Sequence, residues 1–219
     1  MTTKDIIKIT FNLVIIYVVG GVLLAAVYAK TSPIIFKANV KEKKEALSKM
    51  MPEADKIEKL GDWHPHEKHA EYYVAKKDGK PIGYVVETYG KGYSSYIDIL
   101  FSVNNDFIVQ KMEILHQAET PGLGDDVSTP AFKKQFAGKD EQHLKVEKIE
   151  TTENIQALTG ATISSRAVTE DGVKKGLIFL KEALKNNART DNGKQHNGQT
   201  NGNIEEGGKD KGGDHHGKS

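Results

Sequence analysis

The sequence has no cysteine among its 219 residues. The chain therefore has no thiolate for an iron–sulfur cluster or a Cys-ligated zinc ion, no attachment point for a c-type haem and no disulfide. A charge excess is missing too, since 31 basic side chains accompany 30 acidic ones and the formal net charge is +1. With no basic stripe interleaved with aromatic residues, we expect no nucleic-acid binding. A redox role for this chain would require an organic cofactor.

Charged side chains are absent from residues 9–29, which are mostly Ile, Val, Leu, Ala and Phe. A helix over this range would span about 30 Å, the hydrocarbon thickness of a bilayer. A cleaved signal peptide is the alternative, but its apolar region usually has only about 7–15 residues. We therefore predict an uncleaved transmembrane anchor in residues 1–30.

The charges beside this segment bear on its orientation. Two lysines precede it, whereas five follow it: Lys30, Lys37, Lys41, Lys43 and Lys44. By the positive-inside rule, this count places the large domain in the cytoplasm. Long domains can cross the membrane regardless of local charge, so the count alone does not decide the orientation.

Residues 31–60 predict an amphipathic linker helix. Partial apolar periodicity runs from Val40 to Met51, with Lys and Glu on the other faces, and Pro33 suits a first turn. The folded domain is expected at residues 61–185. Beyond it, residues 186–219 hold only Ala188 and Ile204 as clearly apolar side chains, which predicts a disordered polar tail.

The domain itself predicts an α+β fold, a twisted antiparallel sheet with helices packed on it. Strands are expected at 72–75, 81–88, 96–103 and 107–115, with a further short strand at 144–149. The first two would form a hairpin through an Asp78-Gly79 turn. Helices are expected from Ser128-Thr129-Pro130 and over residues 165–184.

A histidine cluster lies beside the single tryptophan, with His64, His66 and His69 close in sequence. Neither cysteine nor a dense carboxylate pattern accompanies these residues, and Pro65 interrupts any helical face. A surface loop is the expected structure, and we predict no metal site.

Residues 116–124 read His-Gln-Ala-Glu-Thr-Pro-Gly-Leu-Gly. The proline and the two glycines predict a tight loop in which the main chain can approach a flat ligand closely. Glu119 and Thr120 can hydrogen-bond a heterocycle, and Leu123 can lie against a ring. Taken alone, the same pattern is also typical of a plain turn that ends a strand.

Residues 159–162 read Thr-Gly-Ala-Thr and lead directly into a helical pattern. A tight Gly-Ala turn that opens a helix exposes a Thr hydroxyl and leaves backbone N–H groups without intrahelical partners. Those groups and the positive end of the helix dipole favour an anion, phosphate above all. A small-residue turn that merely caps a helix is the alternative.

The two motifs, in this order and after an apolar anchor, resemble the signatures of a known family. The chain is similar to the FMN-binding domain shared by the G subunit of the Rnf electron transport complex and the C subunit of the sodium-translocating NADH:quinone reductase. The resemblance covers most of the chain from the anchor to about Leu184, and it is carried by residues 116–124 and 159–162. The short, compact region before the first motif looks more like the Rnf protein.

The resemblance implies that FMN is the cofactor and that its phosphate forms a phosphoester with the hydroxyl of Thr162. Thr159, Gly160 and Ala161 would present that hydroxyl. The other implied cofactor-binding residues belong to the first motif: Glu119, Thr120, Gly122 and Leu123. No catalytic residue is expected, because an attachment residue needs no turnover of its own.

The implied function is that of an electron carrier in an Rnf-type, ion-translocating ferredoxin:NAD oxidoreductase. Its implied partners are the other membrane subunits of that complex and a flavin transferase that attaches the FMN. The family also implies a single pass through the cytoplasmic (inner) membrane, with the FMN domain on the extracytoplasmic side, opposite to the lysine count. One position departs from the family pattern, since Gln156 stands where the transferase recognition pattern usually has an acidic residue.

Two other functions remain open from the sequence. One is a stand-alone extracytoplasmic flavinylated domain that serves a different electron route. The other is a flavin-free, membrane-tethered binding module. A hydrolase that uses Thr162 with His116 lacks a third group to orient the base.

Overall fold

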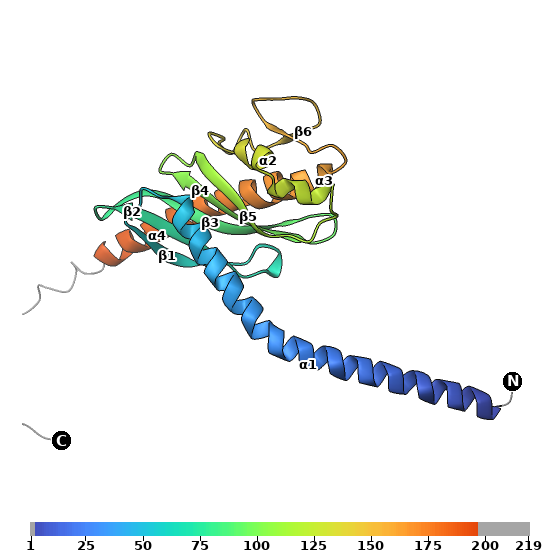
Figure 1. Cartoon of the computed structure of the whole chain (residues 1–219). Helices are drawn as coiled ribbons and strands as arrows, with labels where there is room; N and C mark the ends of the chain where they lie inside the picture. Colours follow the sequence, from blue (N-terminus) through green and yellow to red (C-terminus); the bar gives the residue numbers. More distant parts are fainter. Residues whose placement is uncertain (1–2, 197–219) are drawn as a thin grey trace, which may run out of the picture. The chain divides into compact units, whose positions relative to one another are not determined.

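The computed structural model describes residues 3–196, with side chains as far as residue 187 (Figure 1). Its fold is α+β, as the sequence predicts. In chain order the elements are α1 (Thr3–Met50), β1 (Lys56–Trp63), η1 (Pro65–Glu67), β2 (Ala70–Lys77), β3 (Lys80–Lys91), β4 (Tyr96–Asn104), β5 (Val109–His116), η2 (Gly124–Ser128), α2 (Pro130–Lys134), β6 (Val146–Glu147), β7 (Ile155–Gln156), α3 (Thr162–Arg166), η3 (Ala167–Lys174) and α4 (Lys175–His196).

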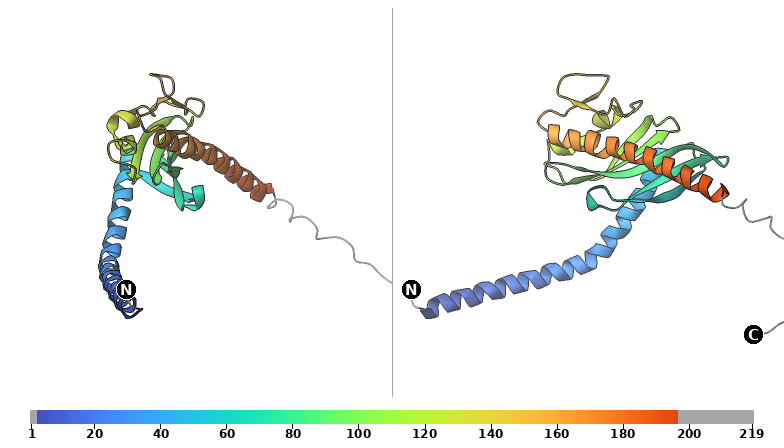
Figure 2. Two further views of the ribbon diagram at one scale, coloured as in Figure 1. Left: turned by 90° about the vertical axis from the view of Figure 1, so that its right-hand side faces the viewer. Right: turned by 180° about the vertical axis from the view of Figure 1, so that it is seen from behind.

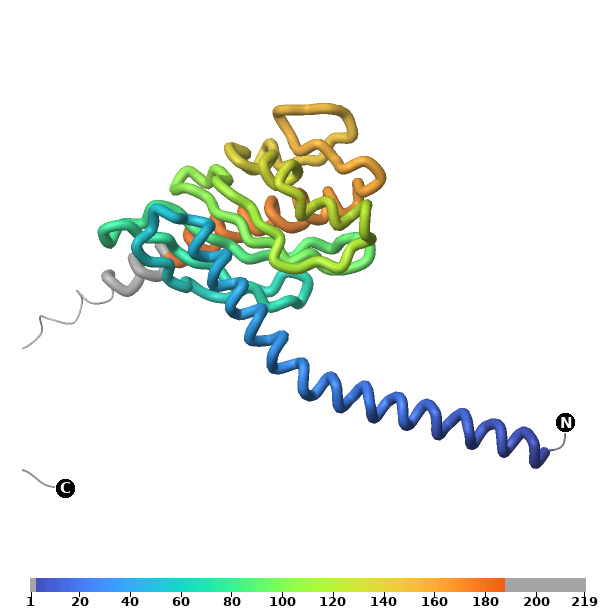
Figure 3. The backbone as a smooth tube through the Cα atoms, in the orientation of Figure 1, coloured from blue at the N-terminus to red at the C-terminus, as the bar shows by residue number. Residues whose placement is uncertain are grey.

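The central element is a five-stranded antiparallel meander in the order β1-β2-β3-β4-β5 (Figure 3). The hairpin between β2 and β3 turns at Asp78 and Gly79, which both have positive φ, as a two-residue type I′ turn requires. At the turn between β4 and β5, the Asn104 side chain accepts hydrogen bonds from the N–H groups of Asp106 and Ile108. The predicted hairpins are therefore confirmed at both turns.

Successive residues of a strand point to opposite faces of the sheet. Both faces of the central strands β3 and β4 are covered by helices, so most side chains of these strands are buried on either side. On one face, Leu100 and Val85 pack with Ala46 and Met50 from the end of α1. The hydroxyl of Ser102 donates to the Met50 carbonyl on this same side, at 3.1 Å. The other face of β3 and β4 lies against η3 and the start of α4.

The helical run from α3 through η3 to the start of α4 crosses that second face, as Figure 2 shows from behind. It approaches the sheet closely because glycines stand at the contacts. A methyl group at Gly90 of β3 would overlap the Ala167 carbonyl, and one at Gly172 would meet the side chain of Ile99. The π-helical turn η3, over which the run is widened, spans this contact.

The start of the domain differs from the sequence prediction. Instead of a separate linker helix over 31–60, α1 continues without interruption from Thr3 to Met50, with Pro33 inside it, and β1 begins at Lys56. Pro33 lacks the N–H of an intrahelical hydrogen bond and its ring crowds the preceding turn, yet α1 continues through it. Strand β1 is an edge strand of mixed polarity with a bulge between Lys59 and Gly61, so it shows no clean alternation.

The end of the domain also differs. The short strand β7 was not predicted, and α4 continues to His196, past the boundary at residue 186 where the disordered tail was expected to begin. Extending an existing helix is easier than nucleating a new one, so α4 continues past Lys185 although the segment that follows has few good helix formers. Residues 197–219 of that predicted tail lie outside the described part of the chain.

Within residues 3–196, α1 is the one helix that is long and apolar enough to cross a membrane. The apolar side chains of its residues 9–29 are not covered by the rest of the domain; Leu24, for example, is 71% exposed. This agrees with the predicted anchor in length and composition.

The close helix–sheet contact gives a stability prediction. Replacement of Gly90 by Ala forces β3 away from Ala167, so we expect a loss of about 1–3 kcal/mol in the free energy of unfolding, as for an overpacked core. Gly20→Ala is the control, since a methyl group there meets nothing within 4 Å. Thermal unfolding of the two variants measures the effect, and equal transition temperatures would contradict it.

Candidate functional site

The two sequence motifs line one cavity of about 390 Å³. The first motif follows β5, and the second forms the turn before α3. Two further segments contribute, the turn between β3 and β4 and the first turn of α3. The lining residues are Tyr93, Glu119, Thr120, Leu123, Gly124, Gly160, Ala161, Thr162, Ile163 and Ser164. This volume lies within the range of about 300–1,000 Å³ that is typical of small-molecule and cofactor sites.

The Thr159–Thr162 turn is built to start a helix beside the cavity. Gly160 has φ +78°, a conformation that side chains rarely adopt, and Ala161 is the N-cap residue of α3. No side chain caps the first turn, so its N–H groups stay available to a ligand. The Ser165 hydroxyl fixes the turn, because it accepts from the Leu158 N–H and donates to the Ala161 carbonyl. Thr162, half-buried, is thus the first residue of the helix.

The loop of the first motif touches this turn directly. Gly122 has φ +74°, and the Leu123 side chain lies so close to Gly160 that a methyl group there would be 3.0 Å from Leu123 Cδ2. Gly124 is packed against Ser164 and Glu119, with no room for a side chain. The two motifs are therefore one structural unit, although they are far apart in the sequence.

Glu119 holds the unit together. Its Oε1 atom accepts hydrogen bonds from the N–H groups of Ser94 and Ser95, at 3.1 and 2.9 Å, and from the Ser95 hydroxyl at 3.1 Å. Its Oε2 atom accepts from the Tyr93 N–H at 3.0 Å and from the Ser164 hydroxyl at 2.6 Å. One buried carboxylate, 6% exposed, therefore ties the β3–β4 turn, the first motif and α3 to one another.

The surroundings of Glu119 keep it ionised. Burial by itself raises the pKa of this carboxyl, but the hydrogen bonds from Ser164 and from the N–H groups of Ser95, Tyr93 and Ser94 outweigh burial and lower the pKa below its usual value. A negative charge is consequently fixed in the wall of the cavity.

The structure distributes the predicted site residues unevenly. The cavity is lined by six of them: Thr162, Ala161, Gly160, Glu119, Thr120 and Leu123. Thr159 and Gly122 are exposed and do not line it. Sequence reasoning missed Tyr93, Ile163 and Ser164. A Gly-Tyr-Ser-Ser turn between two strands carries no ligand signal, and Ser164 is found only by placing the first turn of α3 in space.

Gln156, the position that departs from the family pattern, lies in β7 with an exposed side chain. Its main chain is held by Gln135, whose side-chain oxygen accepts from the Gln156 N–H at 2.8 Å. The Gln156 side chain is thus accessible from the surface.

His116 does not join this site. It lines a different cavity, beside α1, so the structure does not bring it to Thr162 as a hydrolase would require. Two of the three histidines near Trp63 are paired with carboxylates: His66 Nε2 lies 2.7 Å from Asp171, and His69 Nε2 lies 2.8 Å from Asp62.

Three side chains near Trp63 have the spacing of metal ligands. Ligand atoms of Asp62, His69 and Glu71 lie within 4.8 Å of one another. However, the Lys59 ammonium lies 2.7 Å from Asp62 and 2.6 Å from Glu71, so it already supplies the positive charge there.

Comparison with known proteins gives a consistent family. The family model of the FMN-binding domain matches residues 92–177. The G subunit of the proton-translocating ferredoxin:NAD(+) oxidoreductase complex of Clostridium ljungdahlii is 39% identical over 178 residues, which cover 80% of this chain and 91% of that protein. The G subunit of the ion-translocating oxidoreductase complex of Methanosarcina acetivorans is 31% identical, with coverages of 77% and 91%.

Solved structures with some similarity come from a second group. NqrC of Shewanella oneidensis is 28% identical, with a TM-score of 0.41, over 48% of this chain and 54% of that one. The C subunit of the Na(+)-translocating NADH-quinone reductase of Parabacteroides distasonis is 29% identical, with a TM-score of 0.42, over 51% and 60%. This chain therefore spans little more than half the length of either solved chain.

The hydrogen bonds around Glu119 predict that removal of its charge strongly destabilises the fold. In Glu119→Gln, the new NH2 group is itself a donor and cannot accept the hydrogen bonds from the Tyr93 N–H and the Ser164 hydroxyl. We therefore expect a loss of about 2–3 kcal/mol in the free energy of unfolding at pH 7. Because the folded-state pKa is lowered, this stabilisation is present above the pKa of the unfolded chain and is lost as the pH falls through the folded-state value. Chemical unfolding at several pH values measures it, with the exposed Glu53→Gln as control. A wild-type and Glu119→Gln difference that does not change between pH 7 and pH 3 would contradict the assignment.

Proposed function

Because this chain belongs to the family of the G subunits of Rnf-type ion-translocating oxidoreductase complexes, we propose that it is a membrane-anchored electron carrier whose FMN is joined to Thr162 through a phosphoester. The observation that carries the proposal is the single cavity in which the FMN-binding family's two motifs meet. Both the first turn of α3 and the Thr162 hydroxyl belong to this cavity.

The phosphate end of the cofactor fits the Thr162 side of the cavity. A phosphoester carries negative charge, and the uncapped first turn of α3 offers N–H groups and the positive end of a helix dipole. Gly160 and Ala161 keep side-chain bulk away from this end. Glu119 accepts hydrogen bonds from Tyr93 and Ser164, and these donors offset part of the repulsion between its charge and a phosphate in the cavity.

The flavin ring fits the apolar rim. Tyr93, Leu123 and Ile163 line the cavity but are 74%, 45% and 55% exposed, a costly arrangement for three large apolar side chains unless a ligand covers them. A planar aromatic ring would bury these surfaces. Thr120 offers a hydroxyl to the polar edge of the ring or to the ribityl chain.

When bound, FMN would supply one- and two-electron redox chemistry. The residues of this chain bind and orient the cofactor: Thr162 anchors it, α3 holds its phosphate, and Glu119 fixes the walls. No acid, base or nucleophile is required of them, so the protein by itself should not turn over ferredoxin or NAD. Its function would be to pass electrons between other members of the complex.

A covalent link between FMN and Thr162 is useful if the FMN domain lies outside the cytoplasm. Outside the cytoplasm there is little free FMN, so a reversibly bound cofactor would dissociate and be lost. A phosphoester keeps the site occupied whatever the outside concentration. We therefore place the FMN domain on the extracytoplasmic side of the inner membrane, with α1 as the anchor and a flavin transferase as the maturation partner. The exposed Gln156 would face that transferase.

The attachment residue can be tested with matched hydroxyl variants. After co-expression with a flavin transferase, the denatured wild-type protein should carry the mass of one FMN minus one water and should fluoresce in a gel. Thr162→Ala should lose both signals completely. Thr120→Ala removes the other threonine hydroxyl of the cavity and should keep both signals. Modification that persists in Thr162→Ala would contradict Thr162 as the attachment residue.

The absence of native cysteine makes sidedness directly testable. Asp106→Cys introduces one thiol at the exposed β4–β5 turn, and Thr3→Cys introduces one before the membrane segment. In intact cells stripped of their outer membrane, a membrane-impermeant maleimide should label the first variant, and the second only after lysis. The reverse pattern would place the domain in the cytoplasm, as the lysine count predicts.

A further inference from the structure

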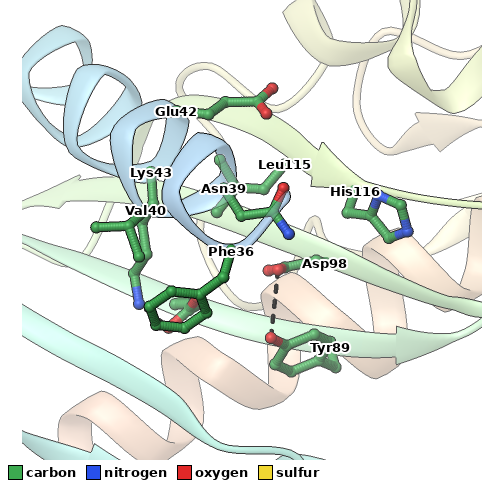
Figure 4. A pocket seen from close by; sticks show the side chains of 10 residues that line it. Phe36, Asn39, Val40, Glu42, Lys43, Tyr89, Asp98, Leu115 and His116 are labelled. Carbon is green, nitrogen blue, oxygen red and sulfur yellow. Dashed lines mark hydrogen bonds and ion pairs between the residues drawn. The ribbon is translucent and has the colours of Figure 1, made fainter. Parts of the chain in front are cut away.

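A second cavity, of about 260 Å³, lies between α1 and the sheet, away from the proposed FMN site (Figure 4). Residues of α1 form its roof, and β3, β4 and β5 form its floor. Its lining residues are Phe36, Asn39, Val40, Glu42, Lys43, Glu87, Tyr89, Asp98, Leu115 and His116. None of them has a role in holding FMN.

The floor contains a carboxylate with an unused oxygen. Asp98 Oδ2 accepts a hydrogen bond from the Tyr89 hydroxyl at 3.2 Å. Its Oδ1 atom is buried and has no hydrogen-bond partner among the described residues. A buried polar oxygen without a partner costs about 1–3 kcal/mol, so a donor that reached Oδ1 through a small shift of the surrounding side chains would be favoured.

The other charged groups around Asp98 do not supply that donor. The Lys43 ammonium, the one lysine in the lining, is engaged by Glu71 and by Glu87 Oε2, the latter at 2.7 Å. Glu42 and Glu87 add negative charge, and His116, opposite Asp98 on β5, is exposed. The lining therefore has more negative than positive charge, and its lysine is already paired.

The surroundings of Asp98 also raise its pKa. Burial, and then the charge of Glu87, raise the pKa of this carboxyl to about 7, against the smaller opposing effect of the Tyr89 hydrogen bond. Ionisation of Asp98 therefore disfavours folding, and stability should fall as the pH rises from about 4 to about 7. A bound cation would remove this penalty.

The walls indicate which kind of cation fits. Phe36, Val40 and Leu115 contribute apolar surface to the cavity that Asp98 lines, and Figure 4 shows the Asn39 side chain projecting from α1 toward Asp98. An apolar wall suits an alkyl chain, and the carboxylate suits an ammonium head with several N–H donors. We propose that this cavity is a binding site for a primary alkylammonium group, with Asp98 as its counter-ion.

The location of the cavity makes a lipid headgroup one source of that group. Phe36 is seven residues past Ala29, the end of the apolar segment, which corresponds to about 10 Å along a helix. If α1 is the membrane anchor, this places the mouth of the cavity near the headgroup layer. A free amine in solution has the same chemistry and is the other source.

The probe for the experiment is n-butylammonium chloride, added to the full chain in detergent at pH 8. We expect saturable binding, seen by calorimetry and as a rise in transition temperature, whereas sodium chloride and n-butanol at equal concentrations should have no such effect. Binding should weaken about tenfold for each pH unit below 7, because Asp98 must lose its proton. Absence of saturable binding at pH 8 would overturn the proposal.

Three variants make the test specific. Asp98→Asn should weaken butylammonium binding about tenfold or more, and should abolish its pH dependence. Val40→Phe fills the cavity from the exposed side of α1 and should block binding while Asp98 remains. Asp106→Asn, an exposed carboxylate on the same sheet, is the matched control and should bind as the wild type does. Equal binding by Asp98→Asn and wild type would refute the role of Asp98.

Native mass spectrometry distinguishes the two sources. A phosphatidylethanolamine adduct that butylammonium displaces, with no phosphatidylcholine adduct, would identify the lipid headgroup. Butylammonium binding without a lipid adduct would identify a free amine. Flavin content is read separately from its absorbance, so failure of this proposal and failure of FMN attachment can be told apart.

Discussion

The proposed site depends on one buried carboxylate. Glu119 receives hydrogen bonds from the β3–β4 turn and from Ser164 in α3, and it belongs itself to the loop after β5. Without it, the loop that carries Leu123 and the turn that carries Thr162 would have only van der Waals contact across Gly160. A charge-assisted network of this kind is stronger than its neutral equivalent and has a single geometry. Glu119 therefore has a structural role in shaping the cavity that it lines.

The two faces of the sheet carry different elements, and each proposed site lies with one of them. On one face, close glycine contacts bring the run from α3 to the start of α4 down on β3 and β4 and so position the first turn of α3. On the other face, the end of α1 packs on Leu100 and Val85, and the second cavity lies beside that contact. An anchor held by the sheet itself would keep the carrier at a fixed distance from the membrane, which suits a relay between neighbouring proteins of a complex.

Much of this could be predicted from the sequence, where local chemistry decides the structure. The Asp78-Gly79 turn, the Thr129 cap of α2 and the Thr162 helix start each follow from a few adjacent residues. The missed features depend on distant partners. Edge strand β1 forms because β2 is beside it, and the partners of Glu119 in the β3–β4 turn lie 24 to 26 residues away. Likewise, the unpaired oxygen of Asp98 arises only when α1 covers β4, which no motif indicates.

The proposed carrier function rests on FMN bonded to Thr162 in the cavity where the two motifs meet. The most direct test is an experimental structure of the flavinylated chain. We predict continuous density from Thr162 Oγ1 through a phosphate at the first turn of α3 to a ring that covers Leu123 and Tyr93. Density for FMN elsewhere, or a phosphate not bonded to Thr162, would contradict this placement.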